Sequence, residues 1–110
     1  MRACIYLRKS TKQQAVSIPS QRSECRAYAK RHGYEIVAEF KDEGVSGLDS
    51  AEIRPGFQSM VEAAQREEFD VVLAWDLSRL TRSDPTLMMA ELLPLRSAGV
   101  QIATTDKAEL

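Results

Sequence analysis

Ser10 and three arginines are the residues of this sequence whose types and positions best suit a chemical reaction. Ser10 follows an apolar run that contains Arg8, and a second apolar run, Phe69–Trp75, leads into Arg79 and Arg82. If the two runs are neighbouring parallel strands, the hydroxyl and the three guanidinium groups gather at one sheet edge, where open α/β sheets bind ligands. Arginine donates paired hydrogen bonds to phosphate oxygens and stays charged at any working pH. The arrangement therefore indicates attack by the serine hydroxyl on a phosphate group.

The elements that must position these groups alternate between strands and helices in the first half of the chain. The apolar run Ala3–Leu7 predicts a buried parallel strand. Ser17 or Ser20 can cap a helix that runs to about residue 31, and Gly33 is a natural stop. Partial alternation of apolar and polar residues then predicts a strand over Glu35–Lys41.

The second half of the chain continues this alternation. The expected elements are a loop over Asp42–Ser50, a helix that opens at Arg54, a strand over Phe69–Trp75, a helix from Pro85 and a strand over Val100–Thr104. Glycines and short polar residues favour the loop, and β-branched and aromatic residues favour the first of these strands. Pro94 is expected to kink or divide the helix that contains it. The fold class is therefore α/β, with a mainly parallel sheet and helices on both faces.

The composition predicts one soluble domain. A chain of 110 residues with 44% hydrophobic and 28% charged residues supports a single core. No apolar run approaches the ~20 residues that span a bilayer, and the first residues lack the features of a signal peptide. Cys4 and Cys25 have no metal-ligand spacing and are expected to be small buried hydrophobes with reduced thiols. These features predict a cytoplasmic protein without membrane contact.

The formal net charge of −1 hides an uneven distribution. Residues 1–31 hold eight of the fifteen Lys and Arg side chains and a single acid, Glu24. A basic N-terminal third fits a polyanionic partner such as nucleic acid. It fits a solvated helix face equally well, and the charges on that face would be Arg22, Arg26, Lys30 and Arg31. Charge alone does not decide between these interpretations.

Several other chemistries lack the residues that they need. A Ser-His-acid triad requires an imidazole, and the single histidine, His32, falls late in a predicted helix and far from the strand ends. No Gly-rich stretch ends in Lys-Ser or Lys-Thr, which excludes a P-loop. A receiver-type phosphoacceptor site requires acids after the first strand, where this chain has Arg8-Lys9-Ser10. One histidine and two separated cysteines do not suit a structural zinc site.

Five short motifs occur in the order in which they occur in one enzyme family. They are YLRKST at Tyr6–Thr11, SIPSQ at Ser17–Gln21, DEGVSG at Asp42–Gly47, RPGF at Arg54–Phe57 and SRLTR at Ser78–Arg82. On these motifs the sequence resembles the catalytic domain of serine recombinases, the resolvase/invertase family, over nearly all of its length. The proline after Arg54 and the DEGVSG segment are more similar to the large serine recombinase branch of integrases and transposases.

The resemblance implies a site-specific DNA recombinase in which Ser10 attacks the scissile phosphodiester, forms a 5′-phosphoserine link and releases a 3′-hydroxyl. The arginines that stabilise the charged transition state would be Arg8, Arg79 and Arg82. The polar residues that orient the phosphate or the arginines would be Gln21, Asp42 and Arg54. No metal is implied, because the arginines supply the positive charge. No cofactor is implied either, because the covalent link preserves the bond for religation.

One position departs from the family pattern. Many members carry an aspartate immediately before the first arginine of the strand-end pair, and this chain carries Ser78 there. Asp76 lies two residues earlier, on the same side of an extended segment, and is a candidate substitute. The role of the family's acid, in protonating the leaving oxygen or steering Arg79, therefore does not carry over directly. The assignment of Ser10 is unaffected.

The resemblance also implies a domain arrangement and partners. Residues 1–110 correspond to the N-terminal catalytic domain, and we expect a truncated chain, because family members continue with a long dimerisation helix and a DNA-binding region. Full-length members, from bacteria or phages, act on double-stranded DNA as homodimers and tetramers. The sequence specifies neither the DNA site nor the choice among integration, excision, inversion and transposition.

Two other functions remain open at this point. A non-catalytic assembly module would keep the fold and contact other subunits, although it has no physical need for Ser10 together with Arg8, Arg79 and Arg82. A serine-dependent phosphatase or phosphotransferase that acts on small phosphate esters would share the serine and the arginines.

Overall fold

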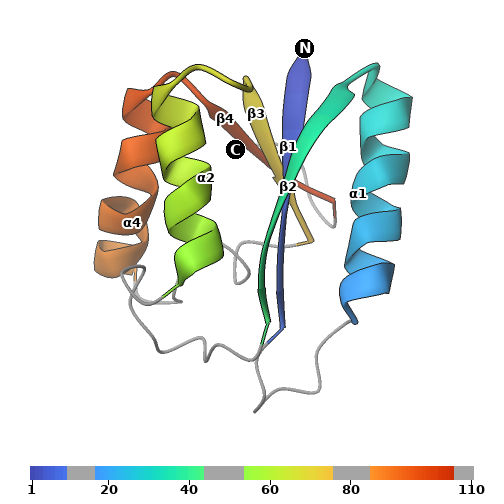
Figure 1. The fold of residues 1–110 in the computed structure, drawn as a ribbon, viewed down its shortest axis with the longest axis horizontal. Coiled ribbons are helices and arrows are strands. Elements are labelled where there is room, and N and C mark those ends of the chain that lie inside the picture. Colours follow the sequence, from blue (N-terminus) through green and yellow to red (C-terminus); the bar gives the residue numbers. More distant parts are fainter. Residues whose placement is uncertain (10–16, 44–53, 76–84, 106–110) are drawn as a thin grey trace.

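The computed structural model describes residues 1–9, 17–43, 54–75 and 85–105. Within these ranges strands and helices alternate (Figure 1). In chain order they are β1 (Arg2–Lys9), α1 (Ile18–His32), β2 (Glu35–Glu43), α2 (Pro55–Gln65), β3 (Val71–Ala74), α4 (Pro85–Ser97) and β4 (Gln101–Thr104). None of these helices is long and apolar enough to cross a bilayer. The order agrees with the α/β pattern expected from the sequence.

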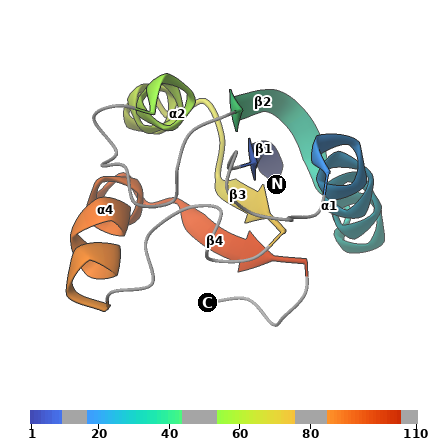
Figure 2. The ribbon, with the colours of Figure 1, turned by 90° about the horizontal axis from the view of Figure 1, so that it is seen from below.

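The described strands form one parallel sheet in the order β2-β1-β3-β4. The chain passes from β1 to β2 on one side and then returns across β1 to place β3 on the other side. This reversal makes β1 and β3 neighbours, so the condition stated for the strands that precede Ser10 and Arg79 is met. α1 covers one face of the sheet, whereas α2 and α4 cover the other (Figures 1 and 2). The prediction of a parallel sheet with helices on both faces is confirmed.

Alternating side chains of β1 contribute to a hydrophobic core on each face of the sheet. The core under α1 includes Ala3, Ile5, Leu7, Cys25 and Tyr28. The core under α2 and α4 includes Cys4, Tyr6, Phe57, Met60 and Leu95. Since helices cover both faces, β1 and β3 are buried on both sides, which explains why the sequence shows a continuous apolar run in each of them.

α1 begins and ends close to where the sequence predicts. Ser17 is its N-cap residue, and the Ser17 hydroxyl accepts a hydrogen bond from the backbone N–H of Ser20 (3.3 Å). Gly33 follows the last turn with a φ of 71°, a left-handed conformation that glycine adopts without steric cost. His32 is exposed at the end of the helix and stacks on Tyr28, with 4.1 Å between ring centroids. The expectation of a surface histidine in the last turn is confirmed.

Cys4 and Cys25 are buried and form no disulfide. Burial raises the pKa of the Cys25 thiol to about 12, and it also raises the pKa of the Cys4 thiol well above its ordinary value. Both thiols are therefore protonated at neutral pH and serve as small apolar residues of the core, as expected.

β2 extends further than the sequence suggests. It continues through Asp42 to Glu43, so the prediction of a loop that begins at Asp42 is wrong for these two residues. The strand is prolonged by its ladder with β1, in which Arg8 pairs with Asp42 and Lys9 pairs with Glu43. The rest of the predicted loop lies outside the described residues. Because Asp42 is in a strand, its side chain has a fixed direction relative to the sheet.

Two other boundaries also differ from expectation. β3 spans only Val71–Ala74 and is shorter than the predicted strand over Phe69–Trp75. α4 continues past Pro94 to Ser97, so the expected division of this helix is wrong. Proline removes only its own backbone donor. The Pro94 carbonyl still accepts a bond from the N–H of Ala98 (3.3 Å), which keeps the last turn closed.

Candidate active site

The ends of β1 and β2 and the starts of α1 and α2 lie at one edge of the sheet, the lower edge in Figure 1. β1 ends at Lys9, directly before Ser10, and its neighbour β3 ends at Ala74. The order of the strands reverses between these two, which is where open α/β sheets bind ligands. Several predicted site residues lie outside the described ranges, namely Ser10, Arg79 and Arg82, together with Ser78 and Asp76.

Gln21 fixes the end of β1 from the α1 side of the sheet. Its side-chain Nε2 donates to the Arg8 carbonyl (3.0 Å), and its Oε1 accepts from the Arg8 backbone N–H (3.4 Å). The Gln21 side chain is fully buried, so water does not compete for these bonds. The amide group thus forms hydrogen bonds with both the N–H and the carbonyl of Arg8, as the backbone of a neighbouring strand would. It holds the chain in place two residues before Ser10.

Asp42 caps α2 from a neighbouring strand. Its Oδ1 accepts from the backbone N–H of Gly56 (2.8 Å), and its Oδ2 accepts from the N–H of Phe57 (2.9 Å) and from the Tyr6 hydroxyl (2.6 Å). Arg54, the N-cap residue itself, makes no side-chain capping bond. The carboxylate therefore satisfies the free donors of the helix start and favourably faces the positive end of its dipole.

The capping contact depends on a close approach between α2 and β2. A Cβ atom on Gly56 would collide with the carbonyl oxygen of Lys41 and would lie 2.9 Å from Oδ2 of Asp42. Only glycine fits at this position without a shift of the backbone. The absence of a side chain at Gly56 allows the helix start to reach the Asp42 carboxylate.

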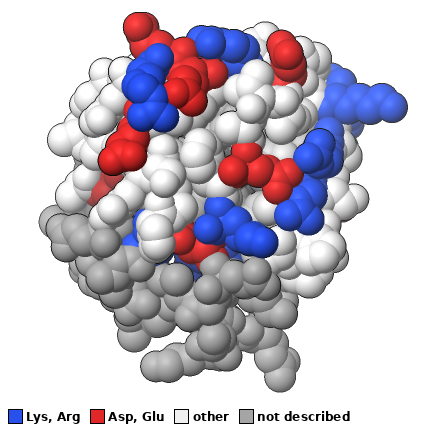
Figure 3. Space-filling model, in the orientation of Figure 1, with Lys and Arg blue, Asp and Glu red and all other residues white. Residues whose placement is uncertain are grey.

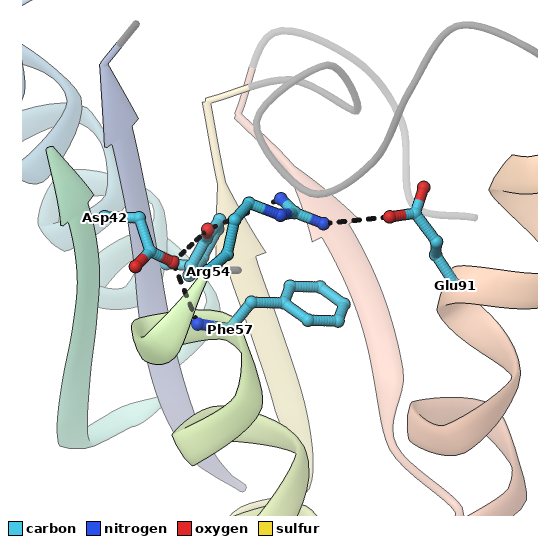
Figure 4. Close-up of polar contacts among 5 residues, drawn as sticks. Asp42, Arg54, Phe57 and Glu91 are labelled. Carbon is cyan, nitrogen blue, oxygen red and sulfur yellow. Dashed lines mark hydrogen bonds and ion pairs between the residues drawn. The ribbon is translucent and has the colours of Figure 1, made fainter. Parts of the chain in front are cut away.

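Arg54 lies inside the molecule, with only 3% of the residue exposed. One terminal nitrogen, Nη2, pairs with Oε2 of Glu91 on α4 at 3.1 Å, and the other, Nη1, donates to the Tyr6 hydroxyl at 3.5 Å. The guanidinium also lies over the ring of Phe57, with Cζ 4.4 Å from the ring centroid. These contacts come from three elements and surround the guanidinium (Figure 4).

Tyr6 connects the two charged groups. Its hydroxyl donates to Asp42 and accepts from Arg54. Burial raises the pKa of Tyr6 far above its ordinary value, and the hydrogen bond to Asp42 raises it further, whereas the charges of Arg54 and Arg8 act in the opposite direction. Tyr6 therefore remains a neutral hydroxyl at any working pH. It can transmit a hydrogen-bond arrangement but cannot serve as a phenolate base.

The structure brings three of the predicted site residues, Arg8, Asp42 and Arg54, together on the face covered by α2 and α4. Arg8 pairs with Asp42 in the β1–β2 ladder, and its charge acts on the same Tyr6 hydroxyl as the charge of Arg54. Gln21 approaches the end of β1 from the opposite face. Within the described part of the chain, no cluster of His, Cys, Asp and Glu side chains has the arrangement of a metal site.

Sequence reasoning missed Tyr6 and Glu91 as members of this group. Tyr6 had a usable signal, because it is a polar-tipped residue inside an aliphatic strand and lies on the same strand face as Arg8. Glu91 had a weaker one, since it precedes Leu95 by four residues and so shares a helix stripe with a core residue. Neither signal indicates Arg54 as the partner, because that contact joins elements far apart in the sequence.

We expect Asp42→Asn to destabilise the fold. An amide offers one oxygen acceptor to three donors that converge on the carboxylate, so at least one buried donor loses its partner. The free energy of unfolding should fall by about 1–3 kcal/mol, measured by urea denaturation. Glu62→Gln, which changes an exposed carboxylate on α2, is the matched control and should leave it within about 0.5 kcal/mol. Equal losses in both variants would contradict the capping role.

Comparison with known proteins relates this geometry to one family. The sequence matches the family model described as the resolvase N-terminal domain over residues 3–109. The structure is similar to the N-terminal catalytic domain of TP901-1 integrase, with a TM-score of 0.84 and 25% sequence identity, over 98% of this chain and 79% of that chain. No curated protein matches the sequence significantly.

Two further solved structures are similar over nearly the whole chain. One is a resolvase family site-specific recombinase from Streptococcus pneumoniae, with a TM-score of 0.81 and 31% identity over 99% of this chain and 75% of that chain. The other is the C-terminal catalytic domain of ISC1926 TnpA, an IS607-like serine recombinase. Its TM-score is 0.81 and its identity 30%, over 98% of this chain and 72% of that chain.

Proposed function

Because the chain belongs to the resolvase family and is the catalytic domain of a site-specific serine recombinase, we propose that Ser10 attacks a scissile phosphodiester in double-stranded DNA. The Ser10 Oγ forms a bond to phosphorus, and the bond between phosphorus and the 3′ oxygen breaks. The products are a 5′-phosphoserine link and a free 3′-hydroxyl. Attack by a 3′-hydroxyl on this link rejoins the strand, so the bond energy is conserved and no energy cofactor is needed.

The observation that carries this proposal is the placement of β1 and β3. These neighbouring strands lead into Ser10 and into the segment with Arg79 and Arg82, at the point where the strand order reverses. The backbone at Arg8 is held by Gln21 just before Ser10. A nucleophile needs such a fixed approach, because a misplacement of about 1 Å can cost 100-fold in rate.

The arginines would stabilise the charge of the transition state. Phosphoryl transfer spreads negative charge over the equatorial oxygens, and preorganised guanidinium groups complement it. We assign this role to Arg8, Arg79 and Arg82. They would provide the positive charge that a magnesium ion provides in other phosphoryl transfers.

Gln21, Asp42 and Arg54 would act by orienting this site. Gln21 holds the backbone at Arg8, and Asp42 ties the end of β2 to the start of α2. Arg54 is buried against Tyr6 and Glu91, so it supports the arrangement from within. A loss of any of the three should therefore shift groups at the sheet edge.

Most of the DNA-binding affinity would come from regions other than these 110 residues. Lys and Arg alternate with Asp and Glu on the face shown in Figure 3, and the formal net charge is −1. Non-specific phosphate contacts alone give weak, salt-sensitive binding. We propose that residues 1–110 form the catalytic domain, that a separate region recognises the site, and that homodimers and tetramers perform strand exchange in the cytoplasm.

The proposal is tested with a nicked suicide substrate that carries the protein's own recombination site. After strand cleavage the short fragment diffuses away, so the covalent intermediate should accumulate and migrate as a protein–DNA adduct on a denaturing gel. The same preparation should not hydrolyse p-nitrophenyl phosphate. Hydrolysis of that ester without any DNA adduct would instead establish a phosphatase.

A further inference from the structure

Glu91 on α4 has no assigned role, yet it pairs with Arg54, one of the two buried arginines of the described residues. We propose that Glu91 is a positioning residue for DNA cleavage, which acts by fixing the guanidinium of Arg54. This inference rests on the proposed recombinase chemistry and adds a residue from α4, an element that contributed no residue to the predicted site. The argument depends on how Arg54 is enclosed and on where its contacts lead.

The pair between Arg54 and Glu91 is shielded from water. The two side chains are 3% and 13% exposed, and Nη2 lies 3.1 Å from Oε2. A surface ion pair contributes little, whereas a buried charge must be compensated by a partner. Glu91 forms an ion pair with Arg54 and so compensates the buried charge of this arginine (Figure 4).

From Arg54 the contacts continue toward the strand end that precedes Ser10. Arg54 donates to the Tyr6 hydroxyl, and the Tyr6 hydroxyl donates to Asp42. Asp42 pairs with Arg8 in the β1–β2 ladder. The charges of Arg54, Asp42 and Arg8 all act on the Tyr6 hydroxyl, which lies between them. A displaced Arg54 would therefore alter the hydrogen bond of Tyr6 and the setting of Arg8.

The position of Glu91 on its helix supports a specific role. Met89 and Leu93, two residues before and after it, are 76% and 60% exposed, so the helix presents them outward. Glu91 lies on the opposite side and points inward to Arg54 (Figure 4). An acid on the inner side of a helix costs desolvation unless it is paired. Here the pairing joins α4 to the N-cap residue of α2 and hence to the network beside the strand ends.

The decisive variant is Glu91→Gln, which keeps the length and one acceptor oxygen but removes the charge. Glu62→Gln on α2 is the matched control, because Glu62 is exposed. On the nicked substrate, Glu91→Gln should slow single-turnover adduct formation roughly tenfold or more, because loss of a contact that orients a reacting group has an effect of this order in enzymes. DNA affinity should stay at the wild-type level, and the rates are compared at a temperature where urea titrations show every variant folded.

A second variant tests whether Glu91 acts through Arg54. If it does, adding Glu91→Gln to Arg54→Met, which removes the guanidinium that Glu91 pairs with, should cause no further loss of rate beyond Arg54→Met alone. A purely structural role would instead add its own loss in the double variant. Independent, multiplicative losses would therefore overturn the proposal.

A third measurement needs no DNA. The Arg54 Nε–H signal in a ¹H–¹⁵N spectrum should shift in Glu91→Gln and remain in place in Glu62→Gln, and an unmoved signal would overturn the contact. If the wild-type protein forms no adduct, the proposed recombinase chemistry fails while this spectrum still decides the contact. If the wild type forms the adduct and Glu91→Gln matches or exceeds its rate, only the positioning role of Glu91 is refuted.

Discussion

Ser10→Ala is expected to abolish the covalent protein–DNA adduct and to leave DNA binding intact. Only the attacking oxygen is removed, so no bond to phosphorus can form, whereas groups that contact the DNA remain. Adduct formation is measured on denaturing gels with the nicked substrate, and binding is measured by electrophoretic mobility shift. Ser23→Ala, at an exposed serine of α1, is the matched control and should form the adduct at the wild-type rate. An adduct that persists in Ser10→Ala would show that another residue is the nucleophile.

Arg79→Lys is expected to have the second largest effect. Lysine keeps the positive charge but loses the planar fork that bonds two phosphate oxygens at once. Removal of one preorganised donor from an oxyanion site typically slows the chemical step roughly 100-fold or more. Single-turnover cleavage should fall by that order, while the urea unfolding curve should match that of the wild type.

The control for this variant is Arg96→Lys, at an exposed arginine near the end of α4. It makes the same chemical change away from the sheet edge and should cleave at the wild-type rate. If Arg79→Lys also cleaves near the wild-type rate, charge alone suffices at residue 79. The argument from paired hydrogen bonds would then be wrong.

Most of the fold could be predicted from local signals, because an apolar run indicates a strand and capping residues indicate where a helix begins and ends. The apolar run before Arg8 identified β1, Ser17 and Gly33 marked the ends of α1, and Pro55 marked the start of α2. The adjacency of β1 and β3 was a condition of the site prediction, and the structure shows it. The errors at Asp42 and Pro94 arose where a ladder or an intact helix overrode a local preference.

The site was harder to predict because its contacts are long-range. The family motifs indicated Asp42 and Arg54, but nothing in their spacing shows that Asp42 caps α2 or that Arg54 is buried. Tyr6 and Glu91 were missed, since their significance depends on partners 36 and 37 positions away in the sequence. The roles of Ser10, Arg79 and Arg82 remain predictions that the experiments above address.

The most direct test of the central claim is to locate the bond between the protein and the DNA. The wild-type adduct is trapped on the nicked substrate, digested with nuclease and trypsin, and analysed by tandem mass spectrometry. Trypsin should release residues 10–12, which contain Ser10, separately from residues 13–22, which contain Ser17 and Ser20. We predict a nucleotide attached through its 5′ phosphate to Ser10. A nucleotide attached to any other residue, or attached through a 3′ phosphate, would contradict the assignment of Ser10 as the recombinase nucleophile.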